Sequence, residues 1–482
     1  MSGSVYEPVI GLEIHVQLKT RTKMFCGCEL SFGDPPNTHT CPVCLGLPGA
    51  LPVVNARAIH YALLIGLALG CELAPRSIFH RKNYFYPDLP KGYQISQYDV
   101  PICSGGQLGD VRIHRAHMEE DAAKLVHVGA SGRIHGADES VVDFNRGGTP
   151  LVEIVTEPDV RSAAQARGWL TLLRETLRQL GVSDVNMEEG SLRCDANVSI
   201  RPVGSDVLGT KTELKNMNSF RYLERGVEAE IARQTAVVEA GGEVEQETLH
   251  YDPSASSAGT KGAISSLRSK EEAHDYRYFP EPDLVPVVVD EAMIEAARAE
   301  LPELPAQRAE RYERELGLTA DSARQLAFRA DLAAYFERAL ASDGAHPQTL
   351  ANWVTGELVA RIGDADPAAS KVEPAALAQL VALLRARTVT PGAAKQVLDT
   401  LVSQGGDSQA IVELEGLAAI GGGDELAEVV QRALASDPDA VAKLRAGNMK
   451  AIGPIVGFVM RETKGRADGG EVTRLVREQL GL

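Results

Sequence analysis

The chain has 482 residues and a formal net charge of −17 at neutral pH, and 44% of its residues are hydrophobic. This length exceeds one ordinary core, so more than one domain is expected. No apolar run is long enough to span a bilayer and no signal peptide is recognisable at the N-terminus, so we expect a cytoplasmic protein. Seven cysteines, an odd number in a long chain, argue against a disulfide framework.

The first informative element is an alternating segment at residues 11–18. Aliphatic residues occupy every second position there, with Glu13, His15 and Gln17 between them. A period of two predicts a β-strand with one apolar and one polar face. The polar face presents a carboxylate, an imidazole and an amide in a row, and such groups can bind a metal ion. Further alternating runs and turn clusters predict an α+β domain over residues 1–290.

Four cysteines follow this strand as a C-x-C pair and a C-x-x-C pair, namely Cys26, Cys28, Cys41 and Cys44. Four thiolates at this spacing can enclose a tetrahedral zinc ion, and they leave no open position for a substrate. The spacing therefore predicts a structural zinc site. Four unpaired cysteines without a metal are the alternative.

Two helices are expected within the α+β domain. One covers residues 55–70 with Asn55 as its N-cap, and the other covers residues 162–180. Residues 252–262 have no apolar periodicity, so a mobile surface loop is expected there.

Residues 82–94 are rich in aromatic side chains and contain Lys82 and Lys91. An aromatic segment with two lysines can stack a nucleobase and contact phosphates. A structural corner of tyrosines and prolines explains the same residues equally well.

Three further segments of the domain are rich in polar groups. Each segment could also be a solvated surface, and residues 117–121 could instead be the acidic start of a helix. Together, carboxylates interleaved with Arg and Lys favour Mg²⁺ or Mn²⁺ and a transferring phosphoryl group. There is no Walker A loop and no nucleophile paired with a base, so a nucleotide site must be of another type. The three segments are residues 117–121, the alternating residues 193–201 and residues 211–216.

Beyond residue 290 the sequence predicts short amphipathic helices separated by Pro, Gly and Asp. A change at residues 405–407 divides this part into a helical domain, 291–405, and a helical tail, 406–482. Residues 432–482 carry nine Lys/Arg against six Asp/Glu, which suits contact with a phosphate backbone but also an ordinary solvated surface. The helices expected first are 290–300, 305–316, 331–342, 347–362 and 374–387.

Several of these segments resemble the B subunits of the aspartyl/glutamyl-tRNA amidotransferases, which work as GatCAB heterotrimers. The resemblance extends over essentially the whole chain, and motifs of this length are highly specific. The segments that carry it are residues 11–18, 41–49, 81–93, 117–121, 143–153, 211–216, 268–283 and 447–457.

The resemblance implies an α+β catalytic domain of the cradle type, followed by two all-α domains, the last a YqeY-like tail that binds tRNA. It implies that ATP phosphorylates the misacylated residue of Glu-tRNA(Gln) or Asp-tRNA(Asn), and that ammonia then yields Gln-tRNA(Gln) or Asn-tRNA(Asn). The ammonia would come from glutamine hydrolysed by a partner amidase, GatA. A small belt-like partner, GatC, would hold the other two chains of the heterotrimer together, and no membrane is involved.

The resemblance also assigns catalytic and ligand residues. Lys82 and Lys91 resemble lysines that line the ammonia channel or the mouth of the site, and Glu120 lies where ammonia is expected to emerge. All four zinc cysteines, which only part of the family has, are present here. Charge and position alone add Arg146, Arg193 and Lys215 as phosphate contacts. The implied ligands of Mg²⁺ or Mn²⁺ are Glu13, His15, Glu120, Asp195 and Glu213. The resemblance implies that Glu13, His15 and Glu120 are also catalytic.

Two other functions compete with this interpretation. A metal-dependent phosphoester hydrolase would use the same carboxylates without ATP, and the isolated chain would then turn over a small phosphoester. A zinc-stabilised tRNA-binding protein would have no catalytic activity at all.

Overall fold

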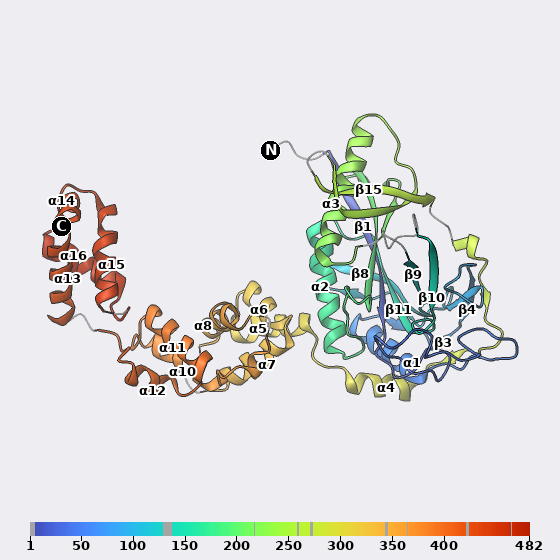
Figure 1. Ribbon diagram of the computed structural model, residues 1–482, viewed down its shortest axis with the longest axis horizontal. Coiled ribbons are helices and arrows are strands. Elements are labelled where there is room, and N and C mark those ends of the chain that lie inside the picture. The colour runs from blue at the N-terminus through green and yellow to red at the C-terminus, as the bar shows by residue number, and fades with distance from the viewer. Residues whose placement is uncertain are drawn as a thin grey trace. The chain divides into compact units, whose positions relative to one another are not determined.

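The computed structural model describes residues 5–128, 137–215, 217–257, 260–269, 273–342, 346–363, 365–420, 424–463 and 465–482. They form a mixed α/β region followed by a helical region (Figure 1). The chain divides into two compact units, Met1–Leu304 and Pro305–Leu482. Within the described residues, every strand belongs to the first unit.

The first unit contains long strands that build its main sheet, short strands around it and four helices of more than one turn. Its strands are β1 Tyr6–Gln17, β2 Glu72–Leu73, β3 Arg76–Ser77, β4 His80–Asn83, β5 Tyr93–Ser96, β6 Cys103–Ser104, β7 Gln107–Leu108, β8 Val111–Glu120, β9 Lys124–Val128, β10 Glu139–Asp143, β11 Pro150–Thr156, β12 Leu192–Pro202, β13 Thr212–Lys215, β14 Glu247–Ser257, β15 Thr260–Ser269, β16 Phe279–Pro280 and β17 Val287–Val288. Its helices are α1 Ala56–Ala68, α2 Ala163–Gln179, α3 Phe220–Glu239, α4 Glu291–Glu300 and a 3₁₀ turn, Ala273–Tyr276.

The main sheet has ten strands among the described residues, in the order β15-β14-β13-β12-β1-β11-β8-β6-β2, with β7 paired to β8. The central strand β1 pairs antiparallel with β11 and β12. Leu12, Ile14 and Val16 of β1 are completely buried, whereas the polar residues between them are half-buried. The alternating strand predicted from the sequence is therefore confirmed.

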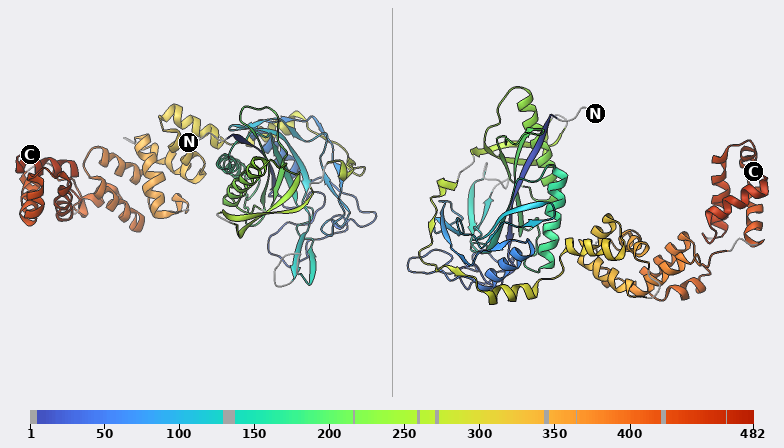
Figure 2. Two further views of the ribbon diagram at one scale, coloured as in Figure 1. Left: turned by 90° about the horizontal axis from the view of Figure 1, so that it is seen from above. Right: turned by 180° about the vertical axis from the view of Figure 1, so that it is seen from behind.

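Helices α2 and α3 lie side by side against one face of this sheet (Figures 1 and 2). Helix α2 buries Leu170, Leu173 and Leu177, and Ser162 caps its N-terminus. Asn55 caps α1 by accepting hydrogen bonds from two backbone N–H groups of the first turn. Both helices predicted in the α+β domain are confirmed.

The opposite face of the sheet carries the polar residues, because strand pairing brings them into register. His15 of β1 pairs with Glu153 of β11 and with Arg193 of β12, and Glu153 pairs with His117 of β8. Paired residues project from the same face. A polar stripe therefore crosses four strands. Because β8 extends to Glu120, the alternative of a helix at residues 117–121 is wrong.

The mobile loop expected at residues 252–262 is also wrong. Strand β14 runs to Ser257, β15 starts at Thr260, and the two pair antiparallel. Strand β14 pairs in addition with β13, in parallel. Backbone ladder hydrogen bonds thus hold a segment whose side chains show no apolar period. Residues 258 and 259 lie outside the described residues.

The second unit is helical, and the helices predicted over residues 305–387 are confirmed with one modification: residues 347–362 contain a π-helical turn. The helices are α5 Pro305–Leu316, α6 Ala320–Ala327, α7 Ala330–Leu340, α8 Pro347–Asn352, the π-turn Trp353–Leu358, α9 Val359–Ile362, α10 Pro374–Arg385, α11 Pro391–Gln404, α12 Ser408–Leu414, α13 Asp424–Ser436, α14 Pro438–Arg445, α15 Ile452–Glu462, α16 Gly469–Leu480 and two 3₁₀ turns, Pro367–Ala369 and Met449–Ala451.

Two hydrophobic clusters occur in the helical unit, one between Ala309 and Leu417 and one between Leu426 and Val476. The division into domains 291–405 and 406–482 stays a prediction. Helix α4 packs on α1, so the first compact unit continues past the sequence-based boundary at residue 290. Of the helices in the described ranges, none combines the length and apolarity needed to cross a lipid bilayer.

Candidate active site and metal centres

The polar stripe gathers one imidazole and two carboxylates at a point where a metal ion fits. His15 Nε2 lies 3.6 Å from Glu119 Oε1 and 3.6 Å from Glu153 Oε2. One ligand atom from each of the three residues lies within 4.8 Å of the other two. Two carboxylates with one imidazole suit Mg²⁺ or Mn²⁺. Glu119 is buried, while the other two are half-buried, so the cluster is accessible from one side.

Neighbouring charges fix the ionisation of Glu153 and of Lys82 beside the cluster. His117 Nε2 lies 3.2 Å from Glu153 Oε2. Burial acts to raise the pKa of Glu153, but the His117 ring outweighs it and holds that pKa well below its usual range. Burial likewise acts to lower the pKa of Lys82, but Tyr278 and Glu119 raise it above its usual value. A stable anion and a stable cation therefore stand together at neutral pH.

A second polar row lies beside the cluster on β1, β12 and β13. Strand pairing sets Glu13 opposite Asp195, and Asn197 opposite Glu213. Lys215 Nζ lies 2.6 Å from Asp195 Oδ2 and 3.4 Å from Glu213 Oε1, and Asn197 Nδ2 donates to Glu13 Oε1 over 2.7 Å. Burial opposes the charge of Lys215, but the carboxylate of Asp195 outweighs it and raises the pKa of Lys215.

Asp121 holds the two arginines that were expected to contact phosphate. Its Oδ2 lies 2.9 Å from Arg193 Nη2 and 3.7 Å from Arg146 Nε, and it accepts a hydrogen bond from Gln17 Nε2 over 2.7 Å. Burial acts to raise the pKa of Asp121, but Arg193 and Arg146 outweigh it and hold that pKa below its usual value. Arg146 also donates to two backbone carbonyl oxygens, which leaves Arg193 as the better placed of the two for a ligand.

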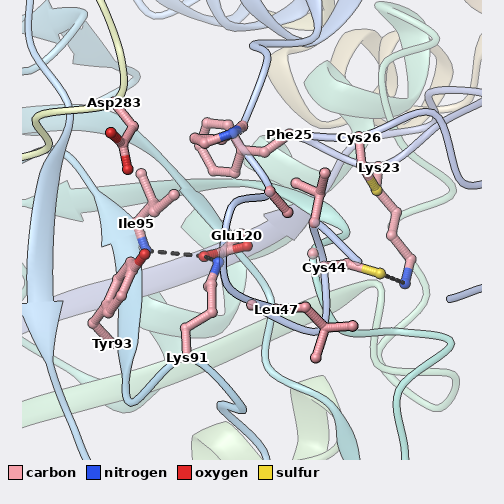
Figure 3. Close-up of a pocket in the computed structure, with 15 residues that line it drawn as sticks. Lys23, Phe25, Cys26, Cys44, Leu47, Lys91, Tyr93, Ile95, Glu120 and Asp283 are labelled. Carbon is pink, nitrogen blue, oxygen red and sulfur yellow. Dashed lines mark hydrogen bonds and ion pairs between the residues drawn. The ribbon is translucent and has the colours of Figure 1, made fainter. Parts of the chain in front are cut away.

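Glu120 follows Glu119 on β8 but belongs to a different site, because consecutive strand residues project to opposite faces. Its carboxylate forms an ion pair with Lys91 and accepts a hydrogen bond from Ile95 N over 3.0 Å. The Lys91 and Glu120 side chains are both largely buried. They line a cavity of about 140 Å³ (Figure 3). Other side chains around this cavity are Lys23, Phe25, Cys44, Leu47, Tyr93 and Asp283.

The four cysteines converge beside the same cavity, and two of them, Cys26 and Cys44, line it. The Sγ atoms of Cys26, Cys28, Cys41 and Cys44 all lie within 4.8 Å of one another. Zn–S bonds of ~2.3 Å set the sulfur atoms of a tetrahedral site about 3.8 Å apart, so these side chains fit zinc. A hydrogen bond from Cys26 lowers the pKa of the Cys44 thiol to about 4, whereas burial raises that of Cys28 to about 11. One sulfur thus favours the thiolate form before any metal is bound.

The structure does not bring the five expected divalent-metal ligands together as one set. His15 joins Glu119 and Glu153, neither of which was chosen from the sequence. Glu120 lies apart from them in the cavity, because consecutive residues of β8 project to opposite faces of the sheet. Glu13, Asp195 and Glu213 form the neighbouring row that Lys215 bridges.

Comparison with known proteins places these sites within a family. A family model described as the GatB/GatE catalytic domain matches residues 8–295, and one described as the GatB domain matches residues 334–480. The chain belongs to the GatB family. The resemblance inferred from the sequence motifs is thereby confirmed, and all the sites described above lie within the catalytic-domain match.

Curated relatives carry one name over the full length of the chain: the B subunit of the aspartyl/glutamyl-tRNA(Asn/Gln) amidotransferase. The protein of that name from Anaeromyxobacter dehalogenans is 51% identical, with 100% of both chains covered. Its counterpart from Moorella thermoacetica is 49% identical over 98% of this chain and 100% of the relative. The one from Geobacter sulfurreducens is 48% identical over 98% of this chain and 99% of the relative.

Proposed function

We propose that this chain converts a carboxylate carried on tRNA into an amide. ATP donates its γ-phosphoryl group to the side chain of Glu-tRNA(Gln) or Asp-tRNA(Asn), and ammonia then displaces phosphate to give Gln-tRNA(Gln) or Asn-tRNA(Asn). A free carboxylate is a poor acceptor for ammonia because it has no good leaving group, so it must first be activated. The observation that carries this proposal is the convergence of His15, Glu119 and Glu153 on the polar stripe.

The charge balance of the stripe supports phosphoryl transfer. In the stripe and the polar groups beside it, carboxylates outnumber lysines and arginines, and a divalent cation bound by His15, Glu119 and Glu153 would offset part of the negative charge of these groups and of the phosphate oxygens. Lys82 and Arg193 lie close enough to the cluster to contribute fixed positive charge to a transferring phosphoryl group. The residues concerned are the carboxylates Glu13, Glu119, Asp121, Glu153, Asp195 and Glu213 and the cations Lys82, Arg146, Arg193 and Lys215.

The cavity of Lys91 and Glu120 is suited to ammonia. The volume of the cavity exceeds that of one ammonia molecule, and the Glu120 carboxylate can accept a proton as ammonia attacks. Lys91 holds that carboxylate in place through their ion pair. Because Glu119 and Glu120 are consecutive, ammonia delivered at Glu120 arrives one residue from the proposed metal ligand.

The remaining parts of the proposal rest on the family resemblance described in the sequence analysis. A partner amidase, GatA, supplies ammonia from glutamine, and the small partner GatC completes the heterotrimer. The YqeY-like tail contacts tRNA, a zinc ion bound by the four cysteines has a structural role, and the protein acts in the cytoplasm.

The test uses the heterotrimer with Glu153→Gln, which keeps the shape of the side chain but removes its charge. ADP release is measured with ATP, Glu-tRNA(Gln) and free ammonium, so that glutamine hydrolysis by the partner amidase is not needed. We expect a loss of at least about 100-fold. Glu157→Gln is the matched control, because Glu157 is four residues away and its carboxylate pairs with His114 at the surface.

Three results would contradict the proposal. Full ADP release by Glu153→Gln would show that the cluster takes no part in the reaction. Turnover of a phosphoester by the isolated chain without ATP would favour a hydrolase. Absence of any tRNA-dependent ADP release in the unmodified heterotrimer would leave only a tRNA-binding role.

A further inference from the structure

Lys23 is a buried lysine beside the four-cysteine cluster, and only 1% of it is exposed. Its Nζ donates a hydrogen bond to the carbonyl oxygen of Phe144 over 3.0 Å and lies 3.7 Å from Cys44 Sγ (Figure 3). In the part of the chain that the structure describes, no carboxylate lies within ion-pair distance of this ammonium. A buried ammonium is costly without a negative partner, so its charge must be balanced by another group.

The cysteine cluster supplies that charge when it holds zinc. Four thiolates carry two more negative charges than Zn²⁺ neutralises, and such an excess is costly near a protein interior unless donors or cations approach the sulfur atoms. The described contacts of the sulfur atoms include one lysine, Lys23 on Cys44, and the backbone N–H of Cys41, which donates to Cys44 over 3.1 Å.

We propose that Lys23 is the counter-cation of the zinc thiolates and a positioning residue for the zinc site. Its ammonium donates to Cys44 Sγ and offsets part of the negative charge that the four sulfur atoms bring to the zinc ion. This inference rests on the zinc site proposed above.

The backbone around Lys23 gives this contact a wider role. Lys23 N donates to the carbonyl oxygen of Cys28 over 3.0 Å, and Met24 N donates to that of Gly148 over 2.7 Å. The ammonium reaches Phe144 in the same turn as Gly148. Lys23 therefore joins the cysteine loops to the turn beside Glu120, and the zinc site and the Lys91–Glu120 cavity share one support.

The test compares zinc release from the purified heterotrimer with and without Lys23→Met, which keeps most of the side-chain volume and removes the charge. The zinc content of each preparation is measured first, and the rate of zinc transfer to a chromogenic chelator is then followed. Because groups around metal ligands contribute about 10- to 100-fold to metal affinity, we expect release at least about 10-fold faster from Lys23→Met. Lys23→Arg, which restores the charge, should recover part of the difference.

Lys19→Met is the matched control. Lys19 is exposed and pairs with Asp184 at the surface, so its removal should leave the rate of zinc release unchanged. Equal rates for Lys23→Met and the unmodified protein would overturn the inference. If the unmodified protein held no zinc at all, the proposed zinc site itself would fail, which distinguishes the two ideas.

A second measurement needs no substitution and so does not depend on folding of a variant. Lysine acylation is mapped by mass spectrometry on the unmodified heterotrimer before and after zinc is removed by a chelator. With zinc bound, Lys23 should be protected; without it the cysteine loops lose the ion that holds them together, Lys23 becomes accessible, and labelling should rise at least about 10-fold. Protection that persists after zinc removal would make Lys23 an ordinary packed lysine and overturn the proposal.

Discussion

Glu119 and Glu120 are neighbours on β8, yet they lie at two candidate sites of different character. Glu119 joins His15 and Glu153 on the polar face of the sheet, among groups that suit a divalent cation. Glu120 pairs with a single buried lysine, Lys91, at a small cavity beside the cysteine loops. The carboxylate of Glu119 therefore lies in a cluster with another carboxylate, whereas the carboxylate of Glu120 is paired with a compensating cation.

A single strand can therefore carry residues of two chemically different sites. Alternation of side chains across β8 separates Glu119 from Glu120 without separating their backbones. An excess of negative charge is needed where a metal and phosphate must bind, whereas proton transfer from ammonia needs one carboxylate held in place. We therefore expect substitutions at the two positions to block different steps of one reaction.

Exchanging each glutamate for glutamine in the heterotrimer tests this separation and should give the largest effects. Glu119→Gln should lower tRNA-dependent ADP release by at least about 100-fold, because a negative ligand is lost from the phosphoryl-transfer site. Glu120→Gln should lower amide formation from free ammonium by a similar factor while ADP release persists. Both rates are measured on the same preparations with Glu-tRNA(Gln).

The comparison fails if the two variants behave alike. Parallel loss of ADP release and amide formation in Glu120→Gln would indicate that Glu120 belongs to the metal site, as the family resemblance implies. The Glu157→Gln variant again serves as the control for an added glutamine near the sheet.

The second prediction concerns the contact between the cysteine loop and Lys91. A Cβ added at Gly46 would collide with Lys91 Cγ and lie 3.2 Å from Lys91 Cα, so Gly46→Ala must displace Lys91. We expect amide formation to fall about 10- to 100-fold, since small misplacements near a reacting group have effects of this size. ADP release and zinc content should be nearly unchanged.

Gly49→Ala provides a close control for Gly46→Ala. Both glycines have a positive φ, +66° and +85°, but nothing lies within 4 Å of a Cβ at Gly49. The two variants share the backbone strain and differ in the collision. If both lose amide formation equally, strain in the loop explains the result and the position of Lys91 does not matter.

Local patterns were sufficient to predict much of the fold and part of the site. The alternation around His15 predicted strand β1 and its polar face, and the cap at Asn55 predicted where α1 begins. The cysteine spacing likewise predicted a cluster that the structure brings together. In each case the signal lies within a few consecutive residues, where periodicity and capping chemistry act.

Long-range pairing explains what could not be predicted. Glu153 reaches His15 only because β11 pairs with β1, and no local pattern reveals that register. Glu119 could have been recognised, because it shares strand parity with His117, but the segment 117–121 also suited a helix. Strands β14 and β15 were missed because their ladder partners, rather than their side chains, define them.

The smallest expected effect concerns Asp121, which holds Arg193 at the edge of the polar stripe. Asp121→Asn should lower the free energy of unfolding of the first unit by about 1–3 kcal/mol at pH 7, because a charge-assisted hydrogen bond is lost. The pKa of Asp121 is lower in the folded state than its unfolded value near 3.9. Its ionised form therefore stabilises the fold fully above about pH 5, and this contribution is lost as the pH falls below about 4.

The difference between Asp121→Asn and the unmodified protein should thus be constant from pH 7 to pH 5 and shrink below pH 4. Urea unfolding at several pH values, followed by near-ultraviolet circular dichroism, measures it. Asp184→Asn, at the exposed Lys19 pair, is the control and should change stability by less than about 1 kcal/mol. A difference that grew as the pH fell would mean that Asp121 is protonated in the folded protein, and Arg193 would then be held by other groups of the stripe.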